Sequence, residues 1–339
     1  MKKHKYRKTK ISIGILLALL AASILYDFVG PEDYRSMLDV LYDEKGNVLE
    51  NPPYPPSKDY LLGTDRDARD NLLLIIDGLK YTIASVLIVS LLRVAAGAFL
   101  GIVVETWAPA LKAFFKAFFL PFHYIPLLLI GVLLMDSVVF MYNEIPVIVK
   151  IEYQMIVLFL LGFPTVFFFT TDLVKEINTK SYVTSSYLLG GSRLHILLKQ
   201  ILPHLKPQFA LLFVQQILQT LQVMMGLAMF GLFLGGPHQE KIYNTPYKKS
   251  ITNELAGLTG QNFWTLKYSP WVAFSSLGLL LVIFILVIII KNEMVANMEG
   301  QSQKYGRFFS KTKKRKETET ISNKSPERFT PLQKKVLDQ

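Results

Sequence analysis

Long apolar runs alternate with short polar segments along most of the chain, a pattern typical of a protein that crosses a membrane several times. A helix needs roughly 20 apolar residues to cross a hydrocarbon core. Runs near that length occupy residues 11–29, 79–104, 113–134, 153–169, 209–234 and 272–290. The first run continues past the small residues at 21–23, where a secretory signal would be cleaved, so we expect a retained anchor helix. The pattern predicts an all-α membrane protein with six transmembrane helices.

Two prolines, Pro121 and Pro126, interrupt the third apolar run. A proline inside a helix removes one backbone hydrogen bond and bends the axis. We expect a kinked but continuous helix there, followed by an external segment at 135–150. His123 lies between the prolines, and we expect it to be packed or to reach toward the interface, because no second metal ligand lies at helical spacing from it.

The polar stretch 175–207 lies between two apolar runs and predicts two short helices. Ser181 is placed to cap the first, which would end at Gly190-Gly191, where glycine permits a left-handed turn. Ser192 is placed to cap the second, and Pro203 to stop it. A short capped helix between membrane spans predicts a rigid protrusion into the water, the alternative being a helix that lies on the lipid headgroups.

The order of residues in this stretch resembles a known loop. Tyr182-Val183, then Gly190 six residues after Thr184, then Leu202-Pro203 is similar to the cytoplasmic E-A-A-x-x-x-G...L-P loop of binding-protein-dependent ABC importer permeases. Where that family has Glu-Ala-Ala, this chain has Thr184, Ser185 and Ser186, so the charged contact with the ATPase is replaced. The resemblance implies an ATPase-coupling site formed by Tyr182, Val183, Thr184, Ser185, Ser186, Gly190, Leu202 and Pro203.

Three further segments resemble the oligopeptide and dipeptide permeases of the same family, in the same order along the chain. These are Leu62 to Asp65 followed by Arg69-Asp70, then residues 230–237, then Pro270-Trp271. The resemblance implies the type I ABC importer permease architecture, with a cytoplasmic coupling helix between the fourth and fifth transmembrane helices.

Three aspartates, Asp65, Asp67 and Asp70, precede the second apolar run. Such a cluster suggests a calcium loop, but the glycine and the closing glutamate that a calcium loop needs are missing from the spacing. We therefore expect a solvated acidic turn that caps the second span.

Composition and charge agree with a membrane protein and orient it. Of 339 residues, 51% are hydrophobic and 19% are charged, against about 25% charged in soluble domains. The net charge of +11 is concentrated in the first ten residues and after Ile290. Because basic segments stay on the cytoplasmic side, we expect both termini and residues 175–206 in the cytosol of a bacterium, with the protein in its cell membrane. From Lys291 onward the apolar period is lost, which predicts a disordered basic tail.

Polar residues inside the apolar runs mark a candidate solute path. Arg93 lies near the middle of the second run, where it is too costly to face lipid, so it either contacts the carboxylate of a passing solute or is buried with an internal partner. Gln215, Gln219 and Gln222 follow one side of the fifth run, where they either line a path or form hydrogen bonds between helices. The predicted solute path consists of Arg93, Gln215, Gln219 and Gln222.

The sequence contains no phosphate-binding loop, no zinc-ligand pattern and no cysteine, so we expect no cofactor, no metal and no bond chemistry of its own. Energy for uphill transport would come from a partner. By the resemblance the partners are a second homologous permease, two cytosolic ABC ATPase subunits, an extracytoplasmic solute-binding protein, membrane lipid and a peptide substrate, without nucleic acid.

The sequence thus predicts an anchor helix and extracytoplasmic loop at 1–77, a five-helix permease domain at 78–292 and a cytoplasmic tail at 293–339. The expected function is the import of oligopeptides or dipeptides. Alternatives are a nickel-chelate or other small-solute ABC importer, a degenerate scaffold or sensor subunit, and an ion-coupled secondary transporter, although the internal repeat and mid-membrane carboxylate typical of the last are not seen.

Overall fold

The computed structural model describes residues 6–30, 41–42, 48–50, 52–141, 145–242 and 245–322. The chain divides into two units, Met1–Glu293 and Met294–Gln339. Five helical segments are long and apolar enough to cross a membrane, namely Arg7–Val29, Asn71–Trp107, Val147–Asn178, Arg193–Met229 and Pro270–Glu299. The prediction of an all-α protein with several membrane-spanning helices is therefore confirmed.

The first unit begins with α1 (Arg7–Val29) and the short antiparallel pair β1 (Leu41–Tyr42) and β2 (Val48–Glu50). The second span is α2 (Asn71–Trp107), which begins well before the predicted Leu79. The reason is local, because the Asp70 carboxylate accepts hydrogen bonds from the backbone amides of Leu72 (2.8 Å) and Leu73 (3.4 Å) and so caps the helix there.

The predicted continuous third span is wrong. The chain forms two shorter helices instead, α3 (Pro109–Tyr124) and α4 (Leu127–Met141), which are separated at Ile125-Pro126. Pro126 has no amide hydrogen, and its ring disfavours the helical conformation of the residue before it, so it ends one helix and lets another begin. The predicted external segment 135–150 is largely helical as well, since α4 continues to Met141 and α5 begins at Val147. The side chain of His123 lies outside the described residues.

Five helical elements lead into, form and follow the polar stretch 175–207. They are α5 (Val147–Asn178, with Pro164 inside it), α6 (Ser181–Leu188), α7 (Arg193–Ile196), a π-helical turn (Leu197–Ile201) and α8 (Leu202–Met229). An antiparallel hairpin of β3 (Pro237–Ile242) and β4 (Thr245–Ser250) follows, then α9 (Leu255–Asn262) and a 3-10 turn (Phe263–Thr265). The last helix is α10 (Pro270–Ser322). It continues well past Lys291, where the sequence predicts disorder, while residues 323–339 lie outside the described part.

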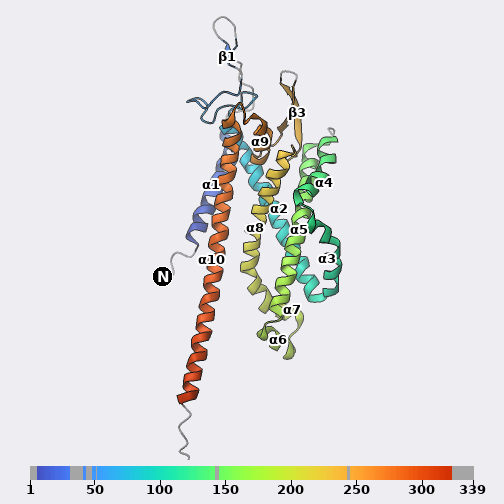
Figure 1. Ribbon diagram of the computed structural model, residues 1–339, viewed down its shortest axis with the longest axis vertical. Coiled ribbons are helices and arrows are strands. Elements are labelled where there is room, and N and C mark those ends of the chain that lie inside the picture. The colour runs from blue at the N-terminus through green and yellow to red at the C-terminus, as the bar shows by residue number, and fades with distance from the viewer. Residues whose placement is uncertain are drawn as a thin grey trace, which may run out of the picture. The chain divides into compact units, whose positions relative to one another are not determined.

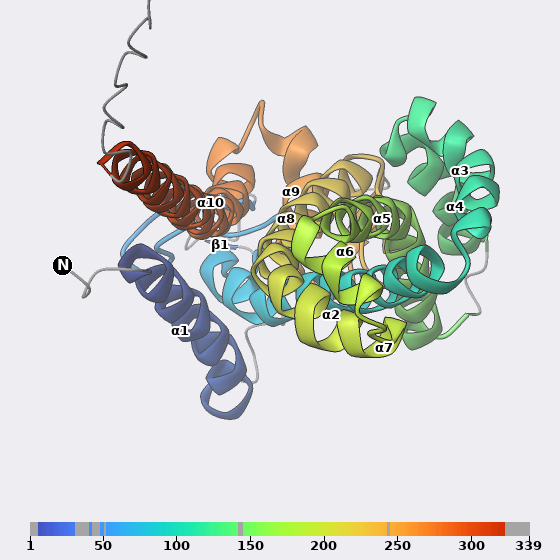
Figure 2. The ribbon, with the colours of Figure 1, turned by 90° about the horizontal axis from the view of Figure 1, so that it is seen from below.

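Helices α2, α5 and α8 run lengthwise through the first unit (Figure 1). The β3–β4 hairpin lies at one end, called the hairpin end below, and α6 and α7 lie at the other, called the α6 end. In the view along the bundle, α2, α5 and α8 lie together, with α3 and α4 on one side and α1 on the other (Figure 2). Figure 1 shows α3 toward the α6 end and α4 toward the hairpin end, so this broken pair returns the chain between the two ends.

Two glycines of α2 allow α2 and α5 to approach closely. A Cβ atom at Gly97 would lie 2.6 Å from Val166 Cγ1, and one at Gly101 would lie 2.8 Å from Thr170 Cβ. Val166 and Thr170 are both fully buried by this contact. The α2–α5 pair is thus held by close steric fit. Such packing, and not a difference in hydrophobicity, is the usual basis of helix association in lipid.

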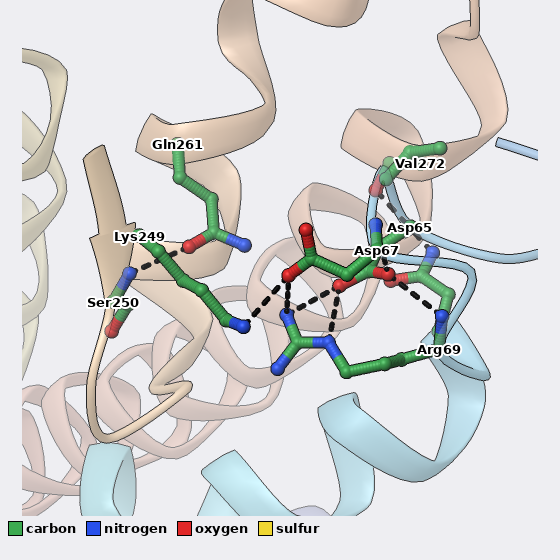
Figure 3. Close-up of polar contacts among 8 residues, drawn as sticks. Asp65, Asp67, Arg69, Lys249, Ser250, Gln261 and Val272 are labelled. Carbon is green, nitrogen blue, oxygen red and sulfur yellow. Dashed lines mark hydrogen bonds and ion pairs between the residues drawn. The ribbon is translucent and has the colours of Figure 1, made fainter. Parts of the chain in front are cut away.

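At the hairpin end, a buried ion-pair cluster ties the loop before α2 to β4 (Figure 3). The Asp65 carboxylate accepts hydrogen bonds from Arg69 Nε (2.9 Å) and Nη2 (2.5 Å). Asp67 lies 3.2 Å from Arg69 Nη2 and 2.7 Å from Lys249 Nζ. Asp65 and Asp67 are almost fully buried, so the predicted solvated turn is wrong for them, whereas the capping role is right for Asp70. Each of these two carboxylates is paired with a basic side chain, and the cluster holds the loop before α2 against β4.

Candidate functional site

The predicted protrusion between the fourth and fifth apolar runs is present, and α6 forms its outer part. α6 begins after Lys180 and ends at Leu188, and Gly190 follows with φ +86°. The left-handed turn that the glycine was expected to supply is therefore confirmed at Gly190. The predicted capping by Ser181 is wrong, since Lys180 occupies the cap position and no side chain caps this helix.

The second short helix begins as predicted but does not stop as predicted. Ser192 Oγ accepts a hydrogen bond from the His195 amide (3.3 Å) and so caps α7. The chain then remains helical through the π turn and into α8, with Pro203 in the first turn of α8. A π turn widens the helix by one residue and so accommodates the missing amide hydrogen of the proline. The protrusion is consequently continuous with the long α8 helix.

Apolar side chains fix the base of the protrusion in the bundle. Val183 of α6, Ile196 of α7 and Ile201 are all completely buried, and they pack with Val174 and Ile177 at the end of α5. Ring stacking of Tyr182 on His204, with 5.6 Å between ring centres, adds a link to α8. Gln200 Nε2 also donates a hydrogen bond to Ser186 Oγ (2.6 Å). These contacts make α6 move with α5 and α8 rather than independently.

The outer side of the protrusion exposes three leucine side chains among polar ones. Leu188 and Leu189 are 84% and 88% exposed, and Leu194 on α7 is 55% exposed. Two hydroxyl groups of the Thr-Ser-Ser segment turn back on their own helix, because Thr184 Oγ1 donates to Lys180 O (3.4 Å) and Ser186 Oγ donates to Tyr182 O (3.0 Å). The tip therefore offers leucine side chains, and no charge takes the place of the missing glutamate.

The remaining residues of the predicted coupling set lie around this tip. Ser185 is exposed, Leu202 is half-buried at the start of α8, and Pro203 is exposed beside it. The structure thus brings the eight residues of the set into one region at the α6 end, with Val183 as the only member of the set in the core.

The three glutamines of the predicted path lie on one outward side of α8, called the glutamine face below. Gln215 and Gln222 are exposed and Gln219 is half-buried. Their amide groups make no hydrogen bond to another described residue, so the alternative of hydrogen bonds between helices within this chain finds no support in the described part. An unpaired amide facing hydrocarbon is unfavourable, which indicates that this side of α8 meets water or another subunit.

Arg93 does not lie on the glutamine face. Its side chain is completely buried between α2, α5 and α8. Arg93 Nε donates to Leu158 O (3.0 Å), and Nη1 donates to Gln216 Oε1 (3.2 Å) and Thr220 Oγ1 (2.9 Å). Of the two readings that the sequence left open, this geometry is that of a buried residue with internal partners.

Gln216 is a residue that the sequence analysis missed. It is fully buried next to the exposed Gln215. A signal was available, because Gln216 and Thr220 are four residues apart and so share one face of α8, where a buried arginine in a neighbouring span requires acceptors.

A second missed group holds the chain segment that follows α8. Gln154 of α5 donates from Nε2 to Phe233 O (2.8 Å), and its Oε1 accepts from Gly235 N (2.7 Å). From the opposite side, Glu254 Oε1 accepts from Leu234 N (2.8 Å). The same Glu254 carboxyl accepts from the hydroxyl groups of Ser250 (2.6 Å) and Thr252. The hairpin end of α8 is thereby clamped by two side chains from different parts of the chain.

No family model matches the chain, and no curated protein matches it. Within the described residues, no group of three or more His, Cys, Asp or Glu side chains could hold a metal ion. The α6 protrusion, the glutamine face and the ordered sequence motifs are therefore the features of this chain that bear on its function.

Proposed function

We propose that this chain is the transmembrane permease subunit of an ATP-driven importer in a bacterial cell membrane, with oligopeptides or dipeptides as solutes. The observation that carries the proposal is the α6 protrusion, whose base is buried among α5, the π turn and α8 and whose tip is exposed. A rigid helix that projects beyond the spans and shares a core with two of them can transmit a push from a water-soluble partner to both. This is the role that an ATPase-coupling helix requires.

The chemistry of the tip favours a protein partner over lipid. A helix that lies on headgroups has its apolar side in the acyl boundary and basic residues on the other. Here the exposed leucines Leu188 and Leu189 lie at the end of α6 and in the turn that follows it. Helix α6 itself lies at the end of the bundle away from the hairpin (Figure 1). An apolar knob of this shape fits a groove in a nucleotide-binding subunit, and the contact would be apolar rather than charged, since Thr184, Ser185 and Ser186 carry no charge.

The path of the chain supports an even number of crossings. We propose that α3 and α4 together make the sixth crossing, because they return the chain from the α6 end to the hairpin end (Figure 1). Both termini of the spanning part and α6 would then lie on the cytosolic side, in agreement with the basic residues at the two ends of the sequence.

The glutamine face supports a path shared with a second subunit. Amide side chains offer both donors and acceptors without fixed charge, which suits solutes that have backbone amides in common but differ in their side chains. Gln215 and Gln222 are exposed in the single chain without a partner. The other half of the path would therefore come from a second, homologous permease. Solute choice would rest mainly with an extracytoplasmic binding protein.

The test is to purify the full chain from its own membrane with its partners and to reconstitute the complex in vesicles. We expect two copies of a nucleotide-binding subunit and one further permease, and ATP hydrolysis that rises when peptide and binding protein are added. A complex that contains no ATP-hydrolysing subunit would reject the proposal. A complex that hydrolyses ATP without moving any solute would identify the chain as a sensor subunit instead.

A further inference from the structure

Arg93 is a buried charge whose described contacts contain no opposite charge. Its three donor nitrogens are bonded to a backbone carbonyl of Leu158, an amide oxygen of Gln216 and a hydroxyl of Thr220. Among the described residues, no carboxylate forms an ion pair with it. Arginine keeps its proton in proteins, so the guanidinium carries a full positive charge inside the bundle.

The positive charge is held in place by its packing. A Cβ atom at position 162 would overlap the Arg93 guanidinium, so glycine at that position leaves the space that the group fills. Complete burial also keeps salt and water away from the charge. A buried charge is screened much less than an exposed one, and its field therefore reaches the surroundings of the three helices.

The glutamine face lies within reach of this field. Gln216 and Thr220 bond to Arg93, and they alternate along α8 with Gln215 and Gln219. At 3.6 residues per turn, the two sets are separated by about a third of a turn around α8, and a helix with its side chains is about 10 to 12 Å wide. The guanidinium is therefore roughly 10 Å from a solute that touches the glutamines.

We propose that Arg93 acts through space as a charge filter for the glutamine face, so that the path favours acidic peptides over neutral ones and neutral peptides over basic ones. This inference builds on the proposed function, because it names the charge class of the solute. At roughly 10 Å and an effective dielectric constant of about 20, a unit charge on the solute is favoured or disfavoured about tenfold, which corresponds to about 1.4 kcal/mol. Arg93 does this without touching the solute and without a fixed charge in the path itself.

The chain has no cysteine, so the local field can be measured with thiol reagents of equal size and opposite charge. In the full chain carrying Gln219→Cys, the anionic reagent should react faster, relative to the cationic one, than it does in Leu189→Cys at the exposed tip of the protrusion. We expect the two ratios to differ by about tenfold or more. The difference should shrink as the salt concentration rises, because salt screens the field in a water-filled path.

Changes at Arg93 separate charge from packing. Arg93→Met in the Gln219→Cys background should bring the reagent ratio down to that of Leu189→Cys, whereas Arg93→Lys, which keeps the charge, should preserve most of the difference. If Arg93→Met does not fold, the salt dependence of the reagent ratio in the Gln219→Cys chain, with Arg93 intact, tests the proposal instead. A ratio that is the same at Gln219→Cys and Leu189→Cys, or that does not respond to salt, would overturn the proposal.

A transport assay supplies a second readout that distinguishes the two proposals. Peptides of equal length with one Glu, one Gln or one Lys side chain should be taken up in that order, and Arg93→Met should remove the order. If no peptide is taken up at all, the proposed function fails while the reagent ratio still tests the charge filter. If uptake occurs with no dependence on charge, the filter fails and the importer stands.

Discussion

The Arg93 guanidinium of α2 occupies the space beside Gly162 of α5, where a Cβ atom would overlap it. Gly162→Ala should therefore force Arg93 off its hydrogen bonds to Leu158, Gln216 and Thr220. Overpacking of this kind costs about 1 to 3 kcal/mol of unfolding free energy. Gly278→Ala is the matched control, since Gly278 lies in the span of α10 with no atom within 4 Å of an added Cβ. Unfolding of the detergent-solubilised protein by denaturant, followed by circular dichroism, measures both. Equal stability of the two variants would contradict the packing described.

Gly190 tests the coupling turn through backbone conformation alone. Its φ is +86°, and an added Cβ would meet no atom within 4 Å, so a substitution there acts through strain and not through a clash. A left-handed conformation costs a non-glycine residue about 1 to 2 kcal/mol. Gly190→Val should insert normally but lower the solute moved per ATP hydrolysed. Gly190→Asn should do so less, since asparagine tolerates this conformation. Unchanged coupling in Gly190→Val would show that the turn does not transmit force.

The contribution of Glu254 to the stability of the fold should depend on pH, in a direction that its burial determines. Complete burial raises the pKa of this carboxyl above its ordinary 4.5, and the hydrogen bonds from Ser250, Thr252 and Leu234 oppose the rise only in part. Below pH 4.5 the carboxyl is protonated in both the folded and the unfolded chain, so its contribution to stability is fully present. As pH rises from there through the raised pKa, the unfolded chain loses its proton first, and the contribution falls.

Glu254→Gln isolates this effect, because glutamine keeps the shape but does not titrate. The unfolding free energy of the original chain, minus that of Glu254→Gln, should decrease as pH rises above 4.5. Denaturant titrations at each pH supply the two values. A difference that increases with pH would mean that the carboxylate is stabilised in its charged form, against the burial described.

The crossing pattern can be tested on exposed, described positions. Lys58 precedes α2, Trp264 lies in the turn after α9, and Leu189 ends the α6 protrusion, and all three are exposed. Single cysteines there should react with a membrane-impermeant reagent from outside intact cells at Lys58 and Trp264. Leu189→Cys should react only after the membrane is opened. Without a crossing by α3 and α4, Leu189 would lie outside and Trp264 inside, so labelling of Lys58 and Leu189 but not Trp264 from outside would contradict the proposed sixth crossing.

The apolar runs predicted which segments are helical but not where several of them end. The start of α2 was misplaced because Asp77 and Gly78 interrupt the apolar run, whereas the Asp70 cap begins the helix about two turns earlier. The break at Pro126 could not be decided from sequence, because neighbouring helices satisfy the backbone groups around many prolines in membrane spans. Gly190 was predicted correctly, since few residues other than glycine adopt a left-handed turn.

Side-chain roles were harder to predict where they depend on how a helix is rotated. The glutamines of α8 were visible as a stripe, but which of them would be buried depends on contacts with α2 that are distant in the sequence. Arg93 fixes this rotation by bonding Gln216, and so leaves Gln215 and Gln222 on the outside. The clamp by Gln154 and Glu254 was missed for the same reason, since its members come from segments about 100 residues apart.

The central claim, that α6 seats in an ATP-hydrolysing partner, is tested most directly by a photo-crosslinking amino acid placed at Leu188 in the native membrane. Leu133, which is exposed on α4 and expected to face lipid, is the matched control position. We predict that the Leu188 probe captures a single subunit whose sequence contains a phosphate-binding loop, with a yield that differs between nucleotide-free and vanadate-trapped membranes. The Leu133 probe should capture lipid in both states. Capture of lipid alone at Leu188, or of a protein without a phosphate-binding loop, would contradict the account.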